Sequence, residues 1–522
     1  MSVAAENVEE KDVSDTEHDR DSLVPVTGSI TGDVTEDGCN DVSDMGEEVT
    51  EEEDIEDDMP EIVQGTTKTL ISKLEENLTT VPDHYDSTQL LATEPGPLDP
   101  EGKDIEQVLN IISHSIYRES EGQIVSKLCD RSALLSVVSH SLSAYITTLE
   151  SVPLQRLSSR IASELSLWIC DLFGFPEGQA HCHDDIREGL VRTVRMVLHT
   201  RYPDLSSEGF LALTKSPPVI YITSGTYAEV ASYVCNHLNL PTSTIRCIIS
   251  EEEKPREDDG WNFFSSVIEE DLAAGRTPLM CVANVHSTIF QTHSVAKLKV
   301  SYIFNDPVQY LNGFHFQHLC TEKGLWLHLE GHALSGLTLV SPGSHIRGDS
   351  MTLTIGNWIG VPAVPFVTLY SVPDTAGPAQ IAGLSLVNPS VRLGCLPLWC
   401  VMRSLGQDEV RARVRAVFRM LETISDKLAA MPCLRLLSQA SERKEIRISD
   451  LETGSVDKDF VFNTVSPALA FQYISESPSS LEGRVPAYTD NLNSWLGQIL
   501  QRDAPHVPVE IVDVETTGYV LR

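Results

Sequence analysis

Two side chains that can exchange protons, His328 and Glu330, end a segment in which apolar and polar residues alternate. This segment, from Gly324 to Glu330, is typical of a strand, because successive strand side chains point to opposite faces. A second strand is predicted from Asp349 to Thr354, closed by a turn from Ile355 to Pro362. In an open α/β sheet, ligands bind beyond the carboxyl ends of strands, so we expect both strands to direct their last residues into one crevice.

A second group of reactive side chains combines histidine, cysteine and aspartate between His181 and Asp185. All are metal-ligand types, but His181 and His183 are only two residues apart and no second group has matching spacing. Asp184 and Asp185 instead suit the start of a helix, where negative charge interacts favourably with the helix dipole. We therefore expect a helix start here and no metal site.

The elements that position these residues follow from periodicity. Apolar β-branched runs predict buried strands at 218–223, 277–283 and 364–370. Helical periodicity is seen at 105–116, 134–149, 154–173, 189–202 and 409–431, and Trp168 occupies a core position of its helix. The arginines of 409–431 are expected to face solvent. Residues 444–522 alternate as in a small α+β domain, with a strand at 444–448, a helix at 492–500 and a strand at 509–515.

Acidic residues are concentrated at the start of the chain. Residues 1–61 contain 23 of the 76 acidic residues and only two basic ones, within a net charge of −38. Such a segment cannot bury enough apolar surface to fold, so we predict that residues 1–85 are disordered, as a solvated spacer or an acidic docking tail. The acidic balance argues against nucleic acid or an anionic membrane as a partner, since both attract basic patches.

Cysteine usage and hydropathy indicate the compartment. The eleven cysteines are scattered, without a C-x-x-C pair, and the N-terminus has no signal peptide. This pattern is typical of reduced thiols in an intracellular protein, and we expect a cytoplasmic location. No apolar run approaches the length that spans a bilayer, so we expect no membrane span.

Two motifs carry a family resemblance. The segment WLHLEGHA resembles the W-L-H-V-D-A-A segment of group II pyridoxal-phosphate (PLP) decarboxylases, and DSMTLTIGNW resembles their D-S-x-x-x-N-P-H-K-W segment. The resemblance places Glu330 where the family has the aspartate that pairs with the pyridinium nitrogen. Asn357 stands where the family has the lysine that binds PLP as a Schiff base. The sequence is most similar to the pyridoxal-dependent decarboxylase domain-containing subfamily, which also carries the glutamate and lacks the lysine.

Further segments extend the resemblance over the chain. RLSSRIASELSLWICDLFGFPEG resembles the helix that enters the PLP domain, and LPLWCVMRSLG resembles a later family helix. By resemblance, Tyr227 replaces the histidine that stacks on the PLP ring, and Thr288 matches a threonine of the cofactor turn. His328 lies beside the cofactor strand, although a packed strand histidine explains it equally. The phosphate-binding loop is replaced by residues 179–189, whose Asp184, Asp185 and Glu188 suit a phosphate poorly.

The resemblance implies an α/β fold of PLP-dependent transferase fold type I, similar to aspartate aminotransferase, with a mostly parallel sheet. The implied domains are a helical segment at 86–175, a large domain at 176–435 and a small C-terminal α+β domain at 436–522, which we expect to be incomplete. The implied function is PLP-dependent amino acid decarboxylation, with an amino acid or amine as ligand and a homodimer as the assembly. Because the lysine and the phosphate loop are missing, we expect weak or lost activity.

Three functions therefore stay open: residual PLP binding with weak carboxy-lyase activity, a pseudoenzyme acting as an interaction or regulatory protein, and an unrelated activity using His286, His328 or His332.

One segment interrupts the family pattern at 300–317. Lys299 to Ser301 can be encoded by a splice-donor sequence, and the segment's end by a splice acceptor, so we interpret it as an insertion or retained intron.

Overall fold

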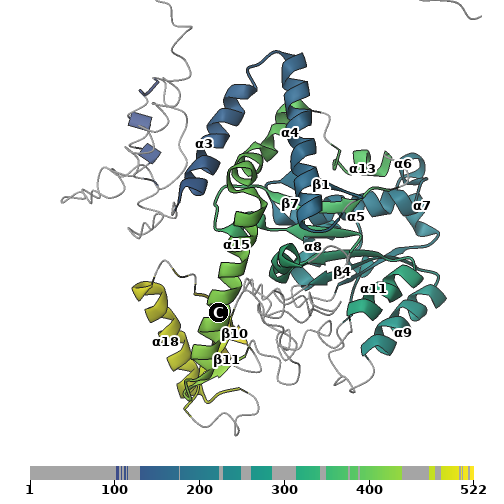
Figure 1. Ribbon diagram of the computed structural model, residues 1–522. Helices are drawn as coiled ribbons and strands as arrows, with labels where there is room; N and C mark the ends of the chain where they lie inside the picture. Colours follow the sequence, from purple (N-terminus) through teal and green to yellow (C-terminus); the bar gives the residue numbers. More distant parts are fainter. Residues whose placement is uncertain are drawn as a thin grey trace, which may run out of the picture. The chain divides into compact units, whose positions relative to one another are not determined.

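A computed structural model of the chain describes residues 102–104, 107–108, 111–112, 115, 130–175, 177–222, 227–248, 260–284, 313–340, 348–373, 377–385, 388–437, 469–475, 484–504, 507, 509–514 and 518–522 (Figure 1). The predicted disordered tail, residues 1–85, lies outside this range. So do most of the helix expected at 105–116, the strand expected at 444–448 and residues 300–312 of the interrupting segment.

Within the described chain, seven strands form one mixed sheet in the order β1-β7-β6-β5-β4-β2-β3. Strands β3, β2, β4, β5 and β6 are parallel, whereas β7 is antiparallel to both β6 and β1. The strands are β1 (Gly178–His183), β2 (Pro218–Ile222), β3 (Ile245–Cys247), β4 (Thr277–Asn284), β5 (Trp326–Glu330), β6 (Ser350–Leu353) and β7 (Phe366–Ser371). The mostly parallel sheet expected from the sequence is confirmed.

Helices cover both faces of this sheet (Figure 1). The described helices are α3 (Arg131–Ile146), α4 (Ser151–Leu172), α5 (Ile186–Arg201), α6 (Leu205–Glu208), α7 (Leu211–Thr214), α8 (Tyr227–Leu238), α9 (Gly260–Ala273), α11 (Gly313–Glu322), α12 (Ile355–Ile359), α13 (Gly377–Ile381), α14 (Pro389–Arg392), α15 (Leu396–Ala429) and α18 (Ala487–Asp503), with 3-10 helices η1 (Thr242–Thr244), η3 (His332–Leu339) and η4 (Leu393–Cys395).

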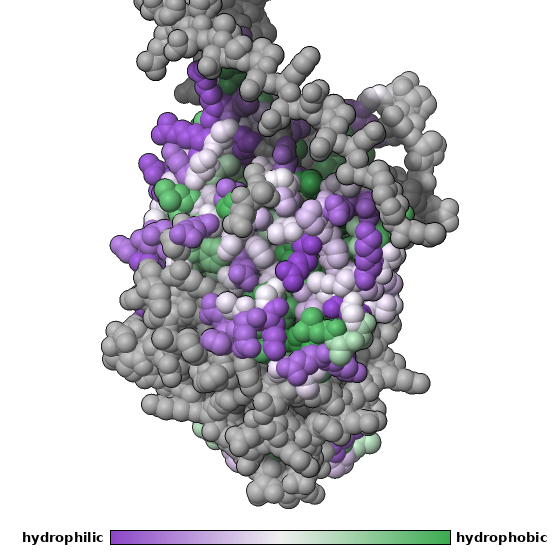
Figure 2. All heavy atoms as spheres, turned by 90° about the vertical axis from the view of Figure 1, so that its right-hand side faces the viewer, coloured by the Kyte–Doolittle hydropathy of each residue, from purple (hydrophilic) through white to green (hydrophobic). Residues whose placement is uncertain are grey.

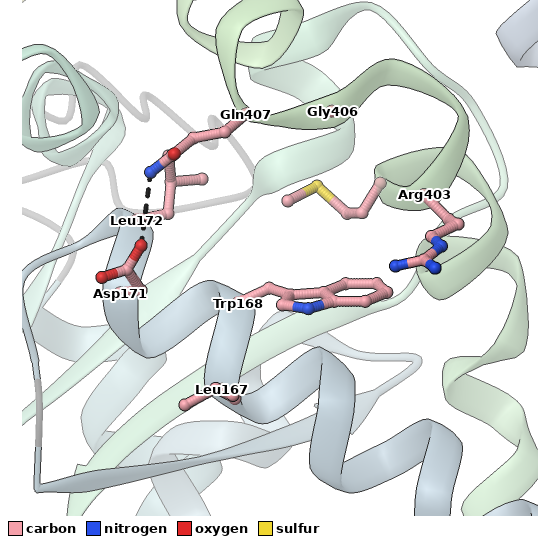
Figure 3. A pocket seen from close by; sticks show the side chains of 8 residues that line it. Leu167, Trp168, Asp171, Leu172, Arg403, Gly406 and Gln407 are labelled. Carbon is pink, nitrogen blue, oxygen red and sulfur yellow. Dashed lines mark hydrogen bonds between the residues drawn. The ribbon is translucent and has the colours of Figure 1, made fainter.

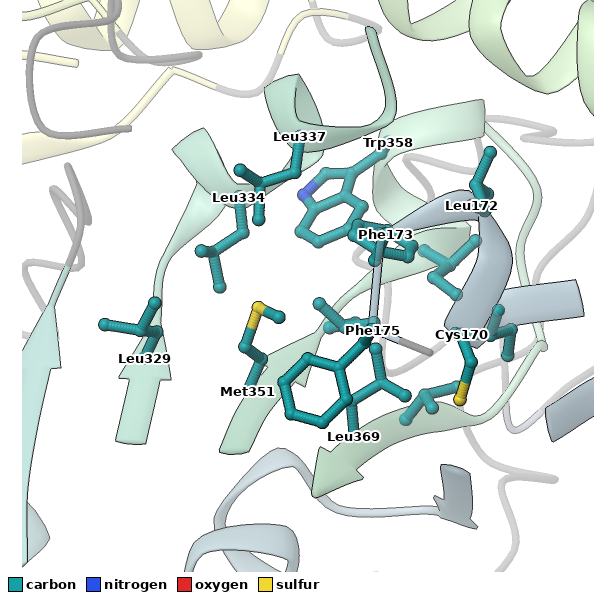
Figure 4. Close-up of a cluster of buried hydrophobic side chains, with 14 of the residues drawn as sticks. Cys170, Leu172, Phe173, Phe175, Leu329, Leu334, Leu337, Met351, Trp358 and Leu369 are labelled. Atoms are coloured by element: carbon teal, nitrogen blue, oxygen red, sulfur yellow. The ribbon is translucent and has the colours of Figure 1, made fainter. Parts of the chain in front are cut away.

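The core explains why the strands read as continuous apolar runs. All five residues of β2 are buried, as expected for a parallel strand covered on both faces. One cluster unites α4, α9, α12 and α15 with alternate residues of the sheet, and a second unites α5, α8 and α13 with the others. Figure 4 shows the first cluster, where Phe173 lies against Trp358 and Phe175 lies near Met351 and Leu369. Each such buried side chain stabilises the fold by about 1.5–3 kcal/mol.

Helix α15 has a sharp kink. Its residue Gly406 has φ 73° and ψ 170°, a conformation that costs glycine less than any other residue. Two helical stretches, matching those predicted at 396–406 and 409–431, therefore meet at Gly406 within one element. The expectation that the arginines of the second stretch face solvent is wrong for Arg413, whose side chain is 23% exposed and pairs with Asp130 at 2.6 Å.

A four-stranded antiparallel sheet in the order β10-β11-β9-β8 forms the last part of the described chain. Its strands are β8 (Leu434–Leu436), β9 (Phe471–Tyr473), β10 (Ile511–Val514) and β11 (Gly518–Leu521). Helix α18 is fixed to it by the buried Asn493, whose Nδ2 donates to Tyr473 O at 3.0 Å and whose Oδ1 accepts from Tyr473 N at 2.6 Å. This arrangement matches the α+β pattern predicted for the C-terminal region.

Polar side chains dominate the surface that faces the viewer in Figure 2, where the coloured apolar patches are small and separated. Some apolar side chains are nevertheless exposed, among them Phe210 and Leu211 near α7.

No helix in the described part of the chain is long and apolar enough to cross a bilayer.

One predicted element differs in type. The segment after β6 was expected to be a turn, but Ile355–Ile359 forms the short helix α12. The glycines and proline that indicate a turn are accommodated because Gly360 ends the helix in the left-handed conformation, with φ 69°. The last residues of the interrupting segment, 313–317, form the first half of α11.

Candidate functional site

The strands β5 and β6 end at the same edge of the sheet, as parallel neighbours must. Glu330 is the last residue of β5, is half-buried and pairs in register with Asn284 at the end of β4. After it, Gly331 adopts φ 123°, which lets the chain leave the strand and enter η3. The predicted position of Glu330 at the carboxyl edge of the sheet is therefore confirmed.

His328 lies inside the sheet and both its ring nitrogens are engaged. Nδ1 is 2.8 Å from Ser350 Oγ, and Nε2 is 3.0 Å from Thr352 Oγ1. Ser350 Oγ also accepts a hydrogen bond from Trp326 Nε1 at 2.8 Å. Burial lowers the pKa of His328 to about 3, so the ring is neutral and acts as one donor and one acceptor. These contacts join β5 to β6 and favour the packed strand histidine among the two interpretations.

Asn357, which the resemblance places where the family has its lysine, is exposed on α12. Its backbone N–H donates to Thr354 O at 3.0 Å, while the next residue, Trp358, is buried against Phe173 with ring centroids 5.9 Å apart. The buried indole fixes the helix, so Asn357 stays outside the core. A carboxamide nitrogen is not nucleophilic and cannot form a Schiff base. The sequence has no lysine between Lys323 and Lys427 to replace it.

Two polar atoms beside Asn357 are buried without a hydrogen-bond partner in the described chain: Thr354 Oγ1 and Trp358 Nε1. Each such atom costs about 1–3 kcal/mol relative to a satisfied one. Sequence reasoning had not singled out either residue, although strand alternation places Thr354 on the face of Ser350 and Thr352.

The start of α5 lies in the segment that, by the resemblance, corresponds to the family's phosphate loop. Asp185 is its N-cap, and the carboxylate accepts a hydrogen bond from Arg187 N at 2.8 Å. Tyr233 OH donates to the other carboxylate oxygen at 3.4 Å, and Glu188, in the first turn, pairs with Arg192. A helix N-terminus binds anions through its unsatisfied N–H groups and dipole. Here the chain's own carboxylates occupy that position, as the predicted helix start implied.

Strand β1 separates the side chains of metal-ligand type between His181 and His183. His181 and His183 lie on one face with ring centroids 6.2 Å apart, and Cys182 points to the other. His183 Nδ1 donates to Asp185 O at 2.7 Å, and Nε2 accepts from Thr368 Oγ1 at 2.8 Å. The described residues include no cluster of three or more histidine, cysteine or acidic side chains able to bind a metal.

The structure describes only some of the remaining predicted site residues. Tyr227 is the first residue of α8, directly after the segment that follows β2, and its side chain is outside the described set. Thr288 and His286 both lie outside the described residues. His332 begins η3 and is half-buried, and burial lowers its pKa.

These residues can be compared with the needs of PLP. The cofactor requires a Schiff-base lysine, a carboxylate for its ring nitrogen, a ring stack and an anion cradle. The described site provides the carboxylate of Glu330. The Asp185 carboxylate lies at the N-terminus of α5, and the resemblance implies that Asn357 stands where the family has its lysine. The described residues therefore do not fit PLP held in the family manner.

Comparisons with known proteins identify relatives of this chain. Residues 466–522 match the family model described as the PDXDC1-like central domain. Pyridoxal-dependent decarboxylase domain-containing protein 1 from Homo sapiens is 30% identical over 439 residues, covering 82% of this chain and 52% of the human protein. The corresponding Danio rerio protein is 30% identical over 444 residues, covering 82% of this chain and 54% of its own length. The chain spans about half the length of these curated relatives.

Solved structures share the fold at low identity. The crystal structure of mouse CSAD has a TM-score of 0.59 at 15% identity, covering 88% of this chain and 94% of that one. The Catharanthus roseus tryptophan decarboxylase in complex with L-tryptophan has a TM-score of 0.56 at 15% identity, covering 89% and 93%. An Oryza sativa TDC structure with PLP has a TM-score of 0.57 at 13% identity, covering 89% and 92%. These similarities show that the chain resembles the pyridoxal-dependent decarboxylase domain-containing proteins and that it shares the fold of PLP-dependent decarboxylases.

Proposed function

We propose that the chain is a pseudoenzyme: a decarboxylase-like protein that acts as an interaction or regulatory protein instead of turning over an amino acid. One observation carries this proposal. Asn357 stands at the lysine position, exposed on a helix that Trp358 anchors in the core. Without an amine there, a PLP enzyme loses its covalent attachment and its main route of exchange with an amine substrate, which costs orders of magnitude in rate.

A second candidate function is residual PLP binding with weak carboxy-lyase activity on an amino acid. The observation that favours it is the position of Glu330, half-buried at the end of β5, where a carboxylate can pair with a pyridinium nitrogen. In this alternative, Glu330, Tyr227 and Thr288 are the cofactor contacts, and His328 supports the strand that carries Glu330.

Further parts of the proposal rest on the family resemblance and on the composition of the chain. Homodimerisation follows from the resemblance, and a cytoplasmic location follows from the cysteine pattern. The division into a helical segment, a large domain and a small domain with limits at 86, 176 and 436 is proposed on the same basis. The family-model match at 466–522 falls inside the small domain. The interpretation of 300–317 as a retained intron stays a prediction, and transcript sequencing across the junction tests it.

The deciding experiment is cofactor retention. The full chain is incubated with PLP, desalted, reduced with borohydride and mapped by mass spectrometry, while a panel of amino acids is screened for released carbon dioxide. The pseudoenzyme proposal expects no lysine-linked cofactor and no turnover above buffer. Retained cofactor that depends on Glu330, shown by its loss in Glu330→Ala, with measurable turnover would establish the second candidate instead.

A further inference from the structure

A half-open cavity lies between α4 and α15, with Trp168 as one wall (Figure 3). Arg403 lies over the indole ring, 5.5 Å from its centroid, and near the Glu164 carboxylate. The Asp171 carboxylate accepts a hydrogen bond from Gln407 Nε2 at 3.4 Å. Because the charged groups of this cavity are engaged within the chain, we assign it no ligand. A stronger candidate is the exposed face of helix α18.

Helix α18 has two different faces. The face on the small sheet is buried and includes Asn493 and Gly497. On the other face, Tyr488 is 74% exposed and Trp495 is 60% exposed. Residues spaced by four, three and four positions lie on one side of a helix. The two aromatic residues therefore share a stripe with two half-buried aliphatic ones, and we call it the outer stripe: Tyr488, Leu492, Trp495 and Ile499.

The outer stripe and the residues around it carry no charge. No charged residue occurs in the sequence from Asn491 to Gln501, although the whole chain has a net charge of −38. Such a net charge makes two copies of the chain repel each other. The centre of a protein interface is enriched in tyrosine and tryptophan and depleted of charged residues, as this stripe is. Contact between two copies is therefore least opposed here.

We propose that the outer stripe binds the outer stripe of a second copy of this chain, with the two α18 helices antiparallel about a two-fold axis. The axis passes between Leu492 and Trp495, so that Leu492 packs on the partner's Trp495. Tyr488 then packs on the partner's Ile499. In this orientation each aromatic ring meets an aliphatic side chain, and the same patch serves both copies, as a two-fold interface requires.

The charges at the ends of α18 agree with this orientation. Arg484, just before the helix, approaches the partner's Asp503, at the end of the helix, and these side chains are 41% and 57% exposed. Both already pair within the chain, with Asp490 and Arg502, so the added attraction is small. The antiparallel pair also sets the positive end of each helix dipole beside the negative end of the other.

The contact is small. Each copy contributes two aromatic and two aliphatic side chains, and an aromatic side chain buries about 150–250 Å². The interface is therefore at the low end of the size range, near or below about 1,200 Å² in total, which is typical of weak and reversible association. It is separate from the homodimer that the family resemblance implies, and it does not rest on the proposed function.

The test is sedimentation equilibrium of the full chain across micromolar concentrations, in about 0.15 M salt. We expect the mass to double as the concentration rises. Tyr488→Gln and Trp495→Gln should each weaken this association by about tenfold or more, because each change removes two aromatic contacts from a symmetric interface. The matched control is Leu211→Gln, which removes a 70% exposed apolar side chain from α7. Any association through another surface is common to the parent and the variants.

Charged variants test the orientation. Tyr488→Glu and Ile499→Lys each place a charge in an apolar contact, so each alone should weaken association by about tenfold or more. In the antiparallel pair, the double variant sets these opposite charges against each other across the axis. It should therefore associate more tightly than either single variant. In a parallel pair each charge would meet its like, and the double variant would be the weakest. Melting temperatures of all variants check that the fold is intact.

Association that the outer-stripe variants weaken, that Leu211→Gln preserves and that the double charged variant partly restores supports the proposal. A mass that does not rise with concentration overturns it. So does a rise that Trp495→Gln leaves unchanged or that Leu211→Gln weakens as much, because the contact would then not depend on the outer stripe. A double charged variant weaker than both single ones overturns the antiparallel arrangement.

Discussion

The hydroxyl of Thr352 lies 3.0 Å from Nε2 of His328 across the parallel strands β6 and β5. Because the histidine is fully buried, loss of this hydroxyl leaves a ring nitrogen without a partner. Thr352→Val should therefore lower the free energy of unfolding by about 1–3 kcal/mol. Thr354→Val is the matched control, since its hydroxyl already lacks a partner in the described chain and removing it should leave stability unchanged or slightly higher. Urea unfolding of both variants provides the comparison, and equal losses would contradict it.

Stability should fall steeply as the medium becomes acidic. Burial lowers the pKa values of His181 and His328 to about 3 and also lowers that of His183. Unfolded histidine has a pKa of 6.5, so only the unfolded chain binds these protons as the pH falls from 6.5 toward 3. The stabilisation is thus complete above about pH 6.5 and is lost below it, by up to about 1.4 kcal/mol per pH unit for each histidine.

The contribution of one histidine can be isolated. His328→Asn should make the decline of melting temperature between pH 7 and pH 5 shallower than in the unaltered protein. An unaltered slope in His328→Asn would mean that this ring is protonated in the folded protein.

Restoring the lysine alone should not restore the cofactor. Asn357→Lys supplies an amine, but the carboxylate of Asp185 still occupies the N-terminus of α5. We expect no lysine-linked PLP after borohydride reduction in Asn357→Lys, and more in the double variant with Asp185→Ser, which keeps a capping hydroxyl without the charge. Stoichiometric cofactor at position 357 in the single variant would show that the Asp185 carboxylate is no obstacle.

Arg413 connects three helices, so its replacement should lower the free energy of unfolding. Its guanidinium donates to Asp130 Oδ2 at 2.6 Å and to Ile359 O at 3.1 Å, joining α15 to α3 and α12. Because the side chain is largely buried, Arg413→Gln should cost about 1–3 kcal/mol. Arg160→Gln, which removes an exposed guanidinium paired with Glu164, should destabilise the fold much less. Thermal unfolding of the two variants compares their losses of stability. Equal losses would mean that Arg413 does not form these contacts in solution.

The sequence predicted the strands and the edge residue Glu330 well, because alternation and β-branched runs report burial directly. It did not predict that Ser350 and Thr352 would hold His328, since a hydroxyl in a strand gives no sign of its partner on the next strand. The cavity beside Trp168 was also missed. Helical spacing correctly placed this tryptophan against the core, but only the packing of α4 on α15 shows that part of its ring lines open space.

At the N-cap of α5, the Asp185 carboxylate competes with any anion that would bind the helix N-terminus. Asp185 is attached to the helix it caps, so its carboxylate is present at a high effective concentration that no dilution reduces. An incoming phosphate must displace this tethered anion as well as overcome its charge. A ligand that binds at this edge should therefore be neutral or cationic. The Asp185 carboxylate would attract such a molecule, whereas it repels an anion.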